Sequence, residues 1–108
     1  MSDFLYEKHA ELCQAVAHPK RLELLDLLRD GERCVCEMAP LLGIRQANLS
    51  QHLSILRTAG VVVTRRSGPS VYYRVRDPRI FEAIDTMRSV IREQFLEASE
   101  LLEAGQTQ

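Results

Sequence analysis

Apolar residues recur at helical spacing along the first third of the chain. Over Phe4 to Ala17 this spacing predicts one helix, which His18-Pro19 ends. Proline suits the first position of a helix, and the leucines that follow Pro19 predict a second, strongly apolar helix that stops at Asp30-Gly31. We expect this second helix to be central to the core.

A short helix and a longer one follow, separated by a tight connection. The short helix is expected to begin near Cys36 and to close at Gly43, and Pro40 is tolerable only if it lies close to the first turn. The longer helix is predicted over Ala47 to Ala59, with its leucines directed inward and Gly60 as the terminator.

Two runs rich in β-branched and aromatic residues come next. Val61 to Arg66 and Val71 to Val75 flank the turn-forming segment Ser67 to Ser70, so the pattern predicts a β-hairpin. Asp77-Pro78 then opens a long final helix, whose apolar stripe consists of Ile80, Ile84, Met87, Ile91 and Phe95.

Length and composition suit one soluble domain. The 108 residues, of which 45% are hydrophobic, can bury one ordinary core over 1–108, with a polar tail that frays from about residue 104. The chain has no run of about 18 apolar residues for a membrane span and no basic-then-apolar secretory start. We therefore expect a cytoplasmic protein with no membrane partner.

The net charge of −1 hides a strong segregation of charge. No Asp or Glu occurs from Met38 to Arg76, and this stretch holds six arginines, whereas 1–37 carries a net −3 and 77–108 a net −4. A cationic block inside an acidic chain is the charge pattern of a face that binds phosphates. A solvated basic surface is the simpler alternative.

The short helix, its Gly-containing turn and the longer helix form a helix-turn-helix pattern, whose second helix can enter the major groove of DNA. The amides of Gln46, Asn48 and Gln51 can pair with adenine, and Ala47 can meet a thymine methyl group. The other candidate contacts to phosphates or base edges are Ser50, His52 and Arg57, and, in a hairpin that would act as a wing, Arg65, Arg66 and Ser70.

The sequence from Cys34 to Val62, with Ser-Gln-His-Leu followed by Leu-Arg-x-Ala-Gly, resembles the ArsR/SmtB family of winged-helix repressors. Val-Tyr-Tyr in the hairpin and Ala-His-Pro-Lys-Arg-Leu near the start match it too, so the resemblance covers nearly the whole chain. It implies a winged helix-turn-helix, α+β and mainly α, in the order α-α-α-α-β-β-α, that represses an operon until an inducer reaches it. One departure is Arg45, which stands where such helices commonly begin with a Ser cap.

The first and last helices carry more apolar surface than a small winged-helix core needs. Their stripes are either intramolecular core or an interface between two copies, and the resemblance implies a homodimer through these terminal helices. Two-fold symmetry then predicts double-stranded operator DNA with an inverted repeat, its half-sites about one helical turn apart.

Cys34-Val35-Cys36 puts two thiols at the entry of the short helix, where the backbone dipole favours thiolates. Within the family, Cys-Val-Cys at this place resembles the motif that senses arsenicals and heavy metals. A third thiol completes the metal site in that motif. In the arsenite-sensing pattern the third cysteine lies on the same helix, at the position that Ala39 occupies here. Cys13 is therefore the remaining cysteine that could be the third ligand. Three thiolates suit As(III) or Sb(III), with cadmium or lead next, as an inducer that is not needed for folding. The alternative for Cys13 is a buried, inert thiol.

The family also has a zinc site on the last helix, which we do not expect here. Met87 stands two positions after Asp85, where the family motif has a histidine, and the final helix contains no histidine.

Other functions remain open from the sequence. Cys34 or Cys36 can oxidise and pair with the other or with Cys13, which would make a redox or reactive-sulfur sensor. A thiol enzyme with Cys36 as nucleophile and His52 or His9 as base lacks a recognisable triad partner, and we expect no enzymatic activity. A DNA-architectural module with purely structural cysteines is the third possibility.

Overall fold

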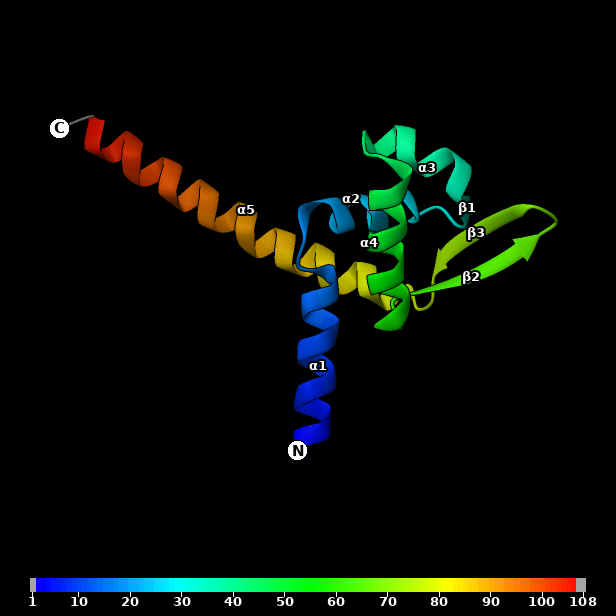
Figure 1. Ribbon diagram of the computed structural model, residues 1–108. Helices are drawn as coiled ribbons and strands as arrows, with labels where there is room; N and C mark the ends of the chain where they lie inside the picture. Colours follow the sequence, from blue (N-terminus) through cyan, green and yellow to red (C-terminus); the bar gives the residue numbers. More distant parts are fainter. Residues whose placement is uncertain (1, 107–108) are drawn as a thin grey trace. The chain divides into compact units, whose positions relative to one another are not determined.

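The structure is a computed structural model that describes residues 2–106, and the chain divides after Asp77 into two compact units. The second unit holds α5 (Arg79–Gln106). The first unit holds α1 (Asp3–Val16), α2 (Pro19–Leu27), β1 (Arg33–Cys34), α3 (Val35–Leu42), α4 (Gln46–Thr58), β2 (Val62–Ser67) and β3 (Ser70–Val75) (Figure 1). The predicted winged helix-turn-helix order is confirmed, with the short strand β1 added between α2 and α3.

The helices of the first unit begin and end at the local signals in the sequence. His18 caps α2 by accepting a hydrogen bond at Nδ1 from the Lys20 N–H at 3.1 Å, and Pro19 occupies the first helical position. Gly43 ends α3 in the left-handed conformation, with φ of 64°. Arg45 precedes α4 without a side-chain capping bond, as its departure from the family pattern predicts.

The start of α3 differs from the prediction. The helix begins at Val35, one residue earlier than expected, so Pro40 lies inside it rather than close to its first turn. The reason is that Cys34 acts as the N-cap, where a sulfur takes the role that an oxygen usually has.

The core of the first unit is built on α2, as predicted, and on the inward face of α4. Leu24 and Leu25 are fully buried, and α2 contacts α1, α3 and α4. Other core side chains with almost no exposed surface are Leu28, Met38, Leu49, Leu53, Leu56 and Val62. This packing holds α3 and α4 as one helix-turn-helix.

The sheet has three antiparallel strands in the order β1-β3-β2. β2 and β3 form the predicted hairpin, which extends from the helices as a wing, with Ser67 opposite Ser70 at its tip (Figure 1). Gly68 turns the chain there with φ of 60°, a conformation that favours glycine. β1 pairs with β3 so that Cys34 lies opposite Tyr72. The start of α3 is therefore tied to the wing by a strand ladder.

In the second unit, α5 follows the predicted stripe. Ile84 is buried, whereas Met87, Ile91 and Phe95 are exposed. The helix continues through Gln106, and the rest of the tail predicted to fray lies outside the described residues. None of the described helices is long and apolar enough to cross a lipid bilayer.

Candidate nucleic-acid interface and cysteine pair

The outer face of α4 carries the polar residues that the sequence singled out. The exposed positions are Gln46, Ala47, Asn48, Ser50, Gln51 and Arg57, while the leucines of the same helix face the core. The α3–Gly43–α4 unit is thus a helix-turn-helix whose second helix presents amides, a methyl group and a guanidinium to solvent. These are the groups that read base edges and bind phosphates in a major groove.

His52 lies on a different face of α4 from these residues. Its ring is half-buried against His18, with 4.8 Å between ring centroids, and its Nδ1 is buried without a hydrogen-bond partner among residues 2–106. Burial, and then the nearby His18 and Arg21, lower the pKa of His52. The spacing offered a signal, because position 52 falls on the helical face shared by Leu49, Leu53 and Leu56.

Arg65 in the wing is held by a residue that the sequence analysis did not single out. Its Nε and Nη2 donate to the two carboxylate oxygens of Glu32 at 3.1 and 2.5 Å, and its guanidinium lies 4.7 Å from the centre of the Tyr72 ring. The hydrogen bond lowers the pKa of Glu32 and raises the pKa of Arg65. Of the other predicted wing contacts, Arg66 is exposed and Ser70 is half-buried.

Cys34 and Cys36 are joined by a disulfide, and their Cα atoms are 5.2 Å apart. The two sulfur atoms differ in environment. Cys34 is 4% exposed, and its Sγ accepts a hydrogen bond from the Cys36 N–H at 3.3 Å at the N-terminus of α3. Cys36 is exposed.

The third predicted metal ligand does not join this pair. Cys13 is a free, exposed thiol on α1 rather than a buried one. In the part of the chain that the structure describes, no three His, Cys, Asp or Glu side chains cluster as a metal site. The three-thiolate arrangement therefore stays a prediction for the reduced protein.

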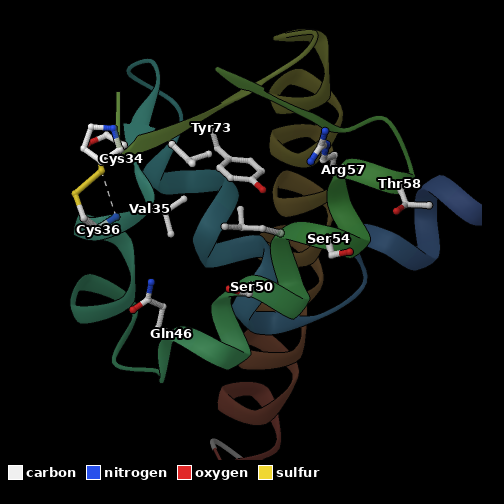
Figure 2. A pocket seen from close by; sticks show the side chains of 13 residues that line it. Cys34, Val35, Cys36, Gln46, Ser50, Ser54, Arg57, Thr58 and Tyr73 are labelled. Carbon is white, nitrogen blue, oxygen red and sulfur yellow. Dashed lines mark hydrogen bonds between the residues drawn. A yellow bond between two sulfur atoms is a disulfide. The ribbon is translucent and has the colours of Figure 1, made fainter. Parts of the chain in front are cut away.

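The cysteine pair and the outer face of α4 share one cavity of about 690 Å³. In Figure 2 the disulfide lies at one side and Arg57 at the opposite side, with Gln46 and Ser50 along the lower edge between them. Tyr73 and Ser70 of β3 complete the wall on the wing side. Four predicted DNA contacts, Gln46, Ser50, Arg57 and Ser70, thus surround the cavity that the cysteines line.

Comparison with known proteins identifies this helix-turn-helix. Residues 18–64, which hold α2 through the first half of β2, match the model of a bacterial regulatory protein, arsR family. An uncharacterized HTH-type transcriptional regulator of Mycobacterium tuberculosis, Rv0081, is 40% identical over 91 residues, which cover 83% of this chain and 80% of the relative. The chain belongs to the arsR family.

Solved structures of relatives agree with this assignment. The crystal structure of Rv0081 matches the arsR-family chain with a TM-score of 0.79 and 37% identity, covering 89% of this chain and 97% of that one. A homodimeric winged helix-turn-helix DNA-binding domain from Mycobacterium bovis, solved by NMR, matches with a TM-score of 0.78 and 32% identity. The match covers 88% of this chain and 91% of that domain. A biofilm growth-associated repressor of Agrobacterium fabrum is 40% identical over 81 residues, 75% of this chain and 69% of that one. The arsR-family chain is a DNA-binding transcriptional regulator and not an enzyme.

Proposed function

We propose that this protein is a homodimeric repressor that binds an inverted-repeat operator and releases it when Cys34 and Cys36 pass from dithiol to disulfide. The observation that carries the proposal is the shared cavity, because the two cysteines and the α4 residues Gln46 and Ser50 line the same space. A chemical change at the sulfur atoms therefore acts beside the side chains that would face DNA.

The operator is bound by α4 in the major groove and by the wing along the backbone. The acid-free segment Met38–Arg76 supplies the positive face, and the exposed Arg57 and Arg66 are its phosphate contacts. Gln46, Asn48 and Gln51 are the base-reading side chains, with Ala47 and Ser50 beside them. His52 has a packing role instead, because its ring is turned toward His18.

The homodimer forms through the terminal helices. Large apolar side chains are exposed on α1, including Phe4 and Leu5, and on α5, including Ile91 and Phe95. Patches of exposed large apolar side chains mark interaction sites. The related Mycobacterium bovis domain is homodimeric, which supports a second copy of this chain as the partner.

The regulatory step is oxidation of the dithiol. Cys34 and Cys36 lose two electrons and two protons to an oxidant of the peroxide class, which is reduced to water while the S–S bond forms. Disulfides in reducing compartments are rare, and those that form there are usually transient and redox-sensing. Because α3 contacts both α4 and β3, a constraint at its first turn can change how the recognition helix and the wing face DNA.

Fluorescence anisotropy with labelled DNA from upstream of the protein's own gene tests this function. We expect the reduced protein to bind at least about tenfold more tightly than the disulfide form, a coupling of the usual size between two sites. Cys34→Ser should abolish the difference, whereas the matched control Cys13→Ser should retain it. Equal affinities of the reduced and oxidised wild-type protein would overturn the proposal.

A soft metal ion is the second candidate inducer. When reduced, Cys34 and Cys36 provide two thiolates close together, which As(III), Sb(III), cadmium or lead would bind, with Cys13 as the predicted third ligand in the same chain or across the dimer. Arsenite and cadmium added to the reduced protein on DNA test this candidate. Release of DNA that is lost in Cys36→Ser supports it, and tight binding unaffected by both ions rules it out.

A further inference from the structure

The cavity beside the disulfide has the size and the polarity of a small-molecule site. Its volume of about 690 Å³ lies in the range of ligand pockets, roughly 300–1,000 Å³. The polar groups in its wall include the amide of Gln46 and the hydroxyls of Ser50, Ser54 and Ser70. Among the described residues, the wall has no carboxylate and its only charged side chain is Arg57.

Arg57 is available to an anion. It is exposed, and no hydrogen bond or ion pair of its guanidinium occurs within residues 2–106. It lies across the cavity from the disulfide (Figure 2). A ligand that contacts both Arg57 and the disulfide would therefore carry a carboxylate at one end and, at the other end, a group that contacts the sulfur atoms.

The two sulfur atoms of the disulfide offer different reactivity to such a molecule. Cys36 is exposed and can be attacked, whereas Cys34 is buried. If a thiolate attacks Cys36, the sulfur that leaves is that of Cys34, which already accepts a hydrogen bond from the Cys36 N–H at the α3 N-terminus. This position favours the negative charge that the leaving sulfur acquires.

We propose that the cavity binds a low-molecular-weight thiol with carboxylate groups, which opens the disulfide and remains attached to Cys36. The thiolate of the ligand forms an S–S bond with Cys36 Sγ as the Cys34–Cys36 bond breaks, and the electron pair leaves on Cys34 Sγ. The exchange needs no further oxidant. Arg57 binds a carboxylate of the ligand at the far side of the cavity.

This inference rests on the proposed function, since it names the class of small molecule that reacts with the oxidised cysteine pair. An adduct on Cys36 fills space lined by Gln46 and Ser50, so the adduct and operator DNA exclude one another. The adduct would thus keep the repressor off DNA although the original disulfide has been opened.

The test compares thiols on the disulfide form of the full chain in a Cys13→Ser background, without DNA. Glutathione carries two carboxylates, its diethyl ester has both of them masked, and cysteamine has none; intact-mass spectrometry follows each adduct. For each thiol, the rate of reaction with the protein is divided by the rate of reaction with a short peptide that contains the Cys-Val-Cys disulfide. This ratio removes the intrinsic reactivity of each thiol.

We expect glutathione to show a rate advantage of at least about tenfold over the peptide, the size that one charge-assisted hydrogen bond provides, and the ester and cysteamine to show none. Peptide mapping should place the adduct on Cys36. Arg57→Gln should remove the advantage, Arg57→Lys should keep most of it, and Arg66→Gln, at an exposed arginine outside the cavity, should leave it unchanged.

Equal ratios for the three probes, an adduct on Cys34, or an advantage that survives Arg57→Gln would overturn the inference. These outcomes are separate from those of the anisotropy experiment. If the thiol state changes DNA affinity but the probes are not distinguished, the proposed function stands without the ligand site. If the probes are distinguished but the thiol state leaves DNA affinity unchanged, the ligand site stands without the proposed function.

Discussion

Arg65 in the wing and Glu32, 33 residues earlier in the chain, form a two-point ion pair beside the cysteine site. The carboxylate holds a guanidinium that lies within the cationic segment, so a phosphate bound by Arg65, as the sequence predicts, would compete with Glu32. The hydrogen bond from Arg65 lowers the pKa of Glu32 below its ordinary value of 4.5, so the carboxylate stays ionised to a more acidic pH than that of an ordinary glutamate.

Replacing Glu32 by Gln should raise operator affinity severalfold, because Arg65 is then free to bind a phosphate. The log of the affinity should also fall more steeply with the log of salt concentration, by about one unit of slope for one added phosphate contact. Anisotropy titrations at four salt concentrations measure both quantities. Glu37→Gln, which removes an exposed acid paired with Arg33 at 3.7 Å, is the matched control, and an equal gain there would indicate a general charge effect.

The His18–His52 contact should make the folded state sensitive to mild acid. The pKa of His52 is lowered in the folded protein, mainly by burial and then by His18 and Arg21, so the unfolded chain binds the proton more readily. Stability is thus fully present above the ordinary pKa of 6.5 and is lost as the pH falls below it.

Thermal unfolding at fixed protein concentration measures this dependence. Between pH 7.5 and 5.5 we expect the midpoint to fall as His52 takes up a proton more readily in the unfolded chain. His52→Gln should flatten the fall, whereas His9→Gln, at an exposed position on α1, should not. A fall of the same size in both variants would show that other groups set the pH dependence.

The start of α4 is a place where stability can be gained. Arg45 is its N-cap residue and makes no capping hydrogen bond, so Arg45→Ser should stabilise the protein by about 1 kcal/mol. Urea unfolding measures the free energy, and Arg45→Ala separates the new cap from the loss of a positive charge. If the Ser and Ala variants unfold at the same urea concentration, the serine does not cap the helix.

Local signals predicted most of this fold. Helix spacing and the capping residues His18 and Gly43 depend on neighbours in sequence, and they located the helices to within about three residues, the largest difference being the end of α2 at Leu27 instead of Asp30. β1 was missed because two residues are too short to show strand alternation, and its pairing partner Tyr72 lies far along the chain. Strand pairing at such separation is decided by tertiary packing.

The candidate site was predicted less completely, for the same reason. The outer face of α4 follows from its periodicity, and the cysteine pair follows from adjacency. The Arg65–Glu32 ion pair carries no local signal, since it joins the wing to the loop before β1. The sequence left open whether Cys13 is a ligand or a buried thiol, because its exposure depends on which faces of α1 the chain itself covers.

The apolar face of α5 should hold the proposed dimer together. Ile91 is 61% exposed, and Ile91→Glu would place a charge on the apolar face that is proposed to be buried in the dimer. We expect the variant to sediment as a monomer at concentrations where the wild-type protein is a dimer. Arg92→Glu is the matched control at the neighbouring position. It changes the charge by two units, against one for Ile91→Glu, and it should leave the dimer intact.

Two exposed residues separate sequence readout from phosphate binding. Gln51 on α4 is a base-reading candidate, so Gln51→Ala should weaken binding to the operator by about 1–3 kcal/mol and leave binding to unrelated DNA nearly unchanged. Arg66 in the wing is a proposed phosphate contact, so Arg66→Gln should weaken binding to both DNAs alike and reduce the salt slope by about one. Anisotropy with operator and scrambled duplexes distinguishes the two effects. An Arg66 variant that loses affinity for the operator alone would mean that the wing reads sequence as well.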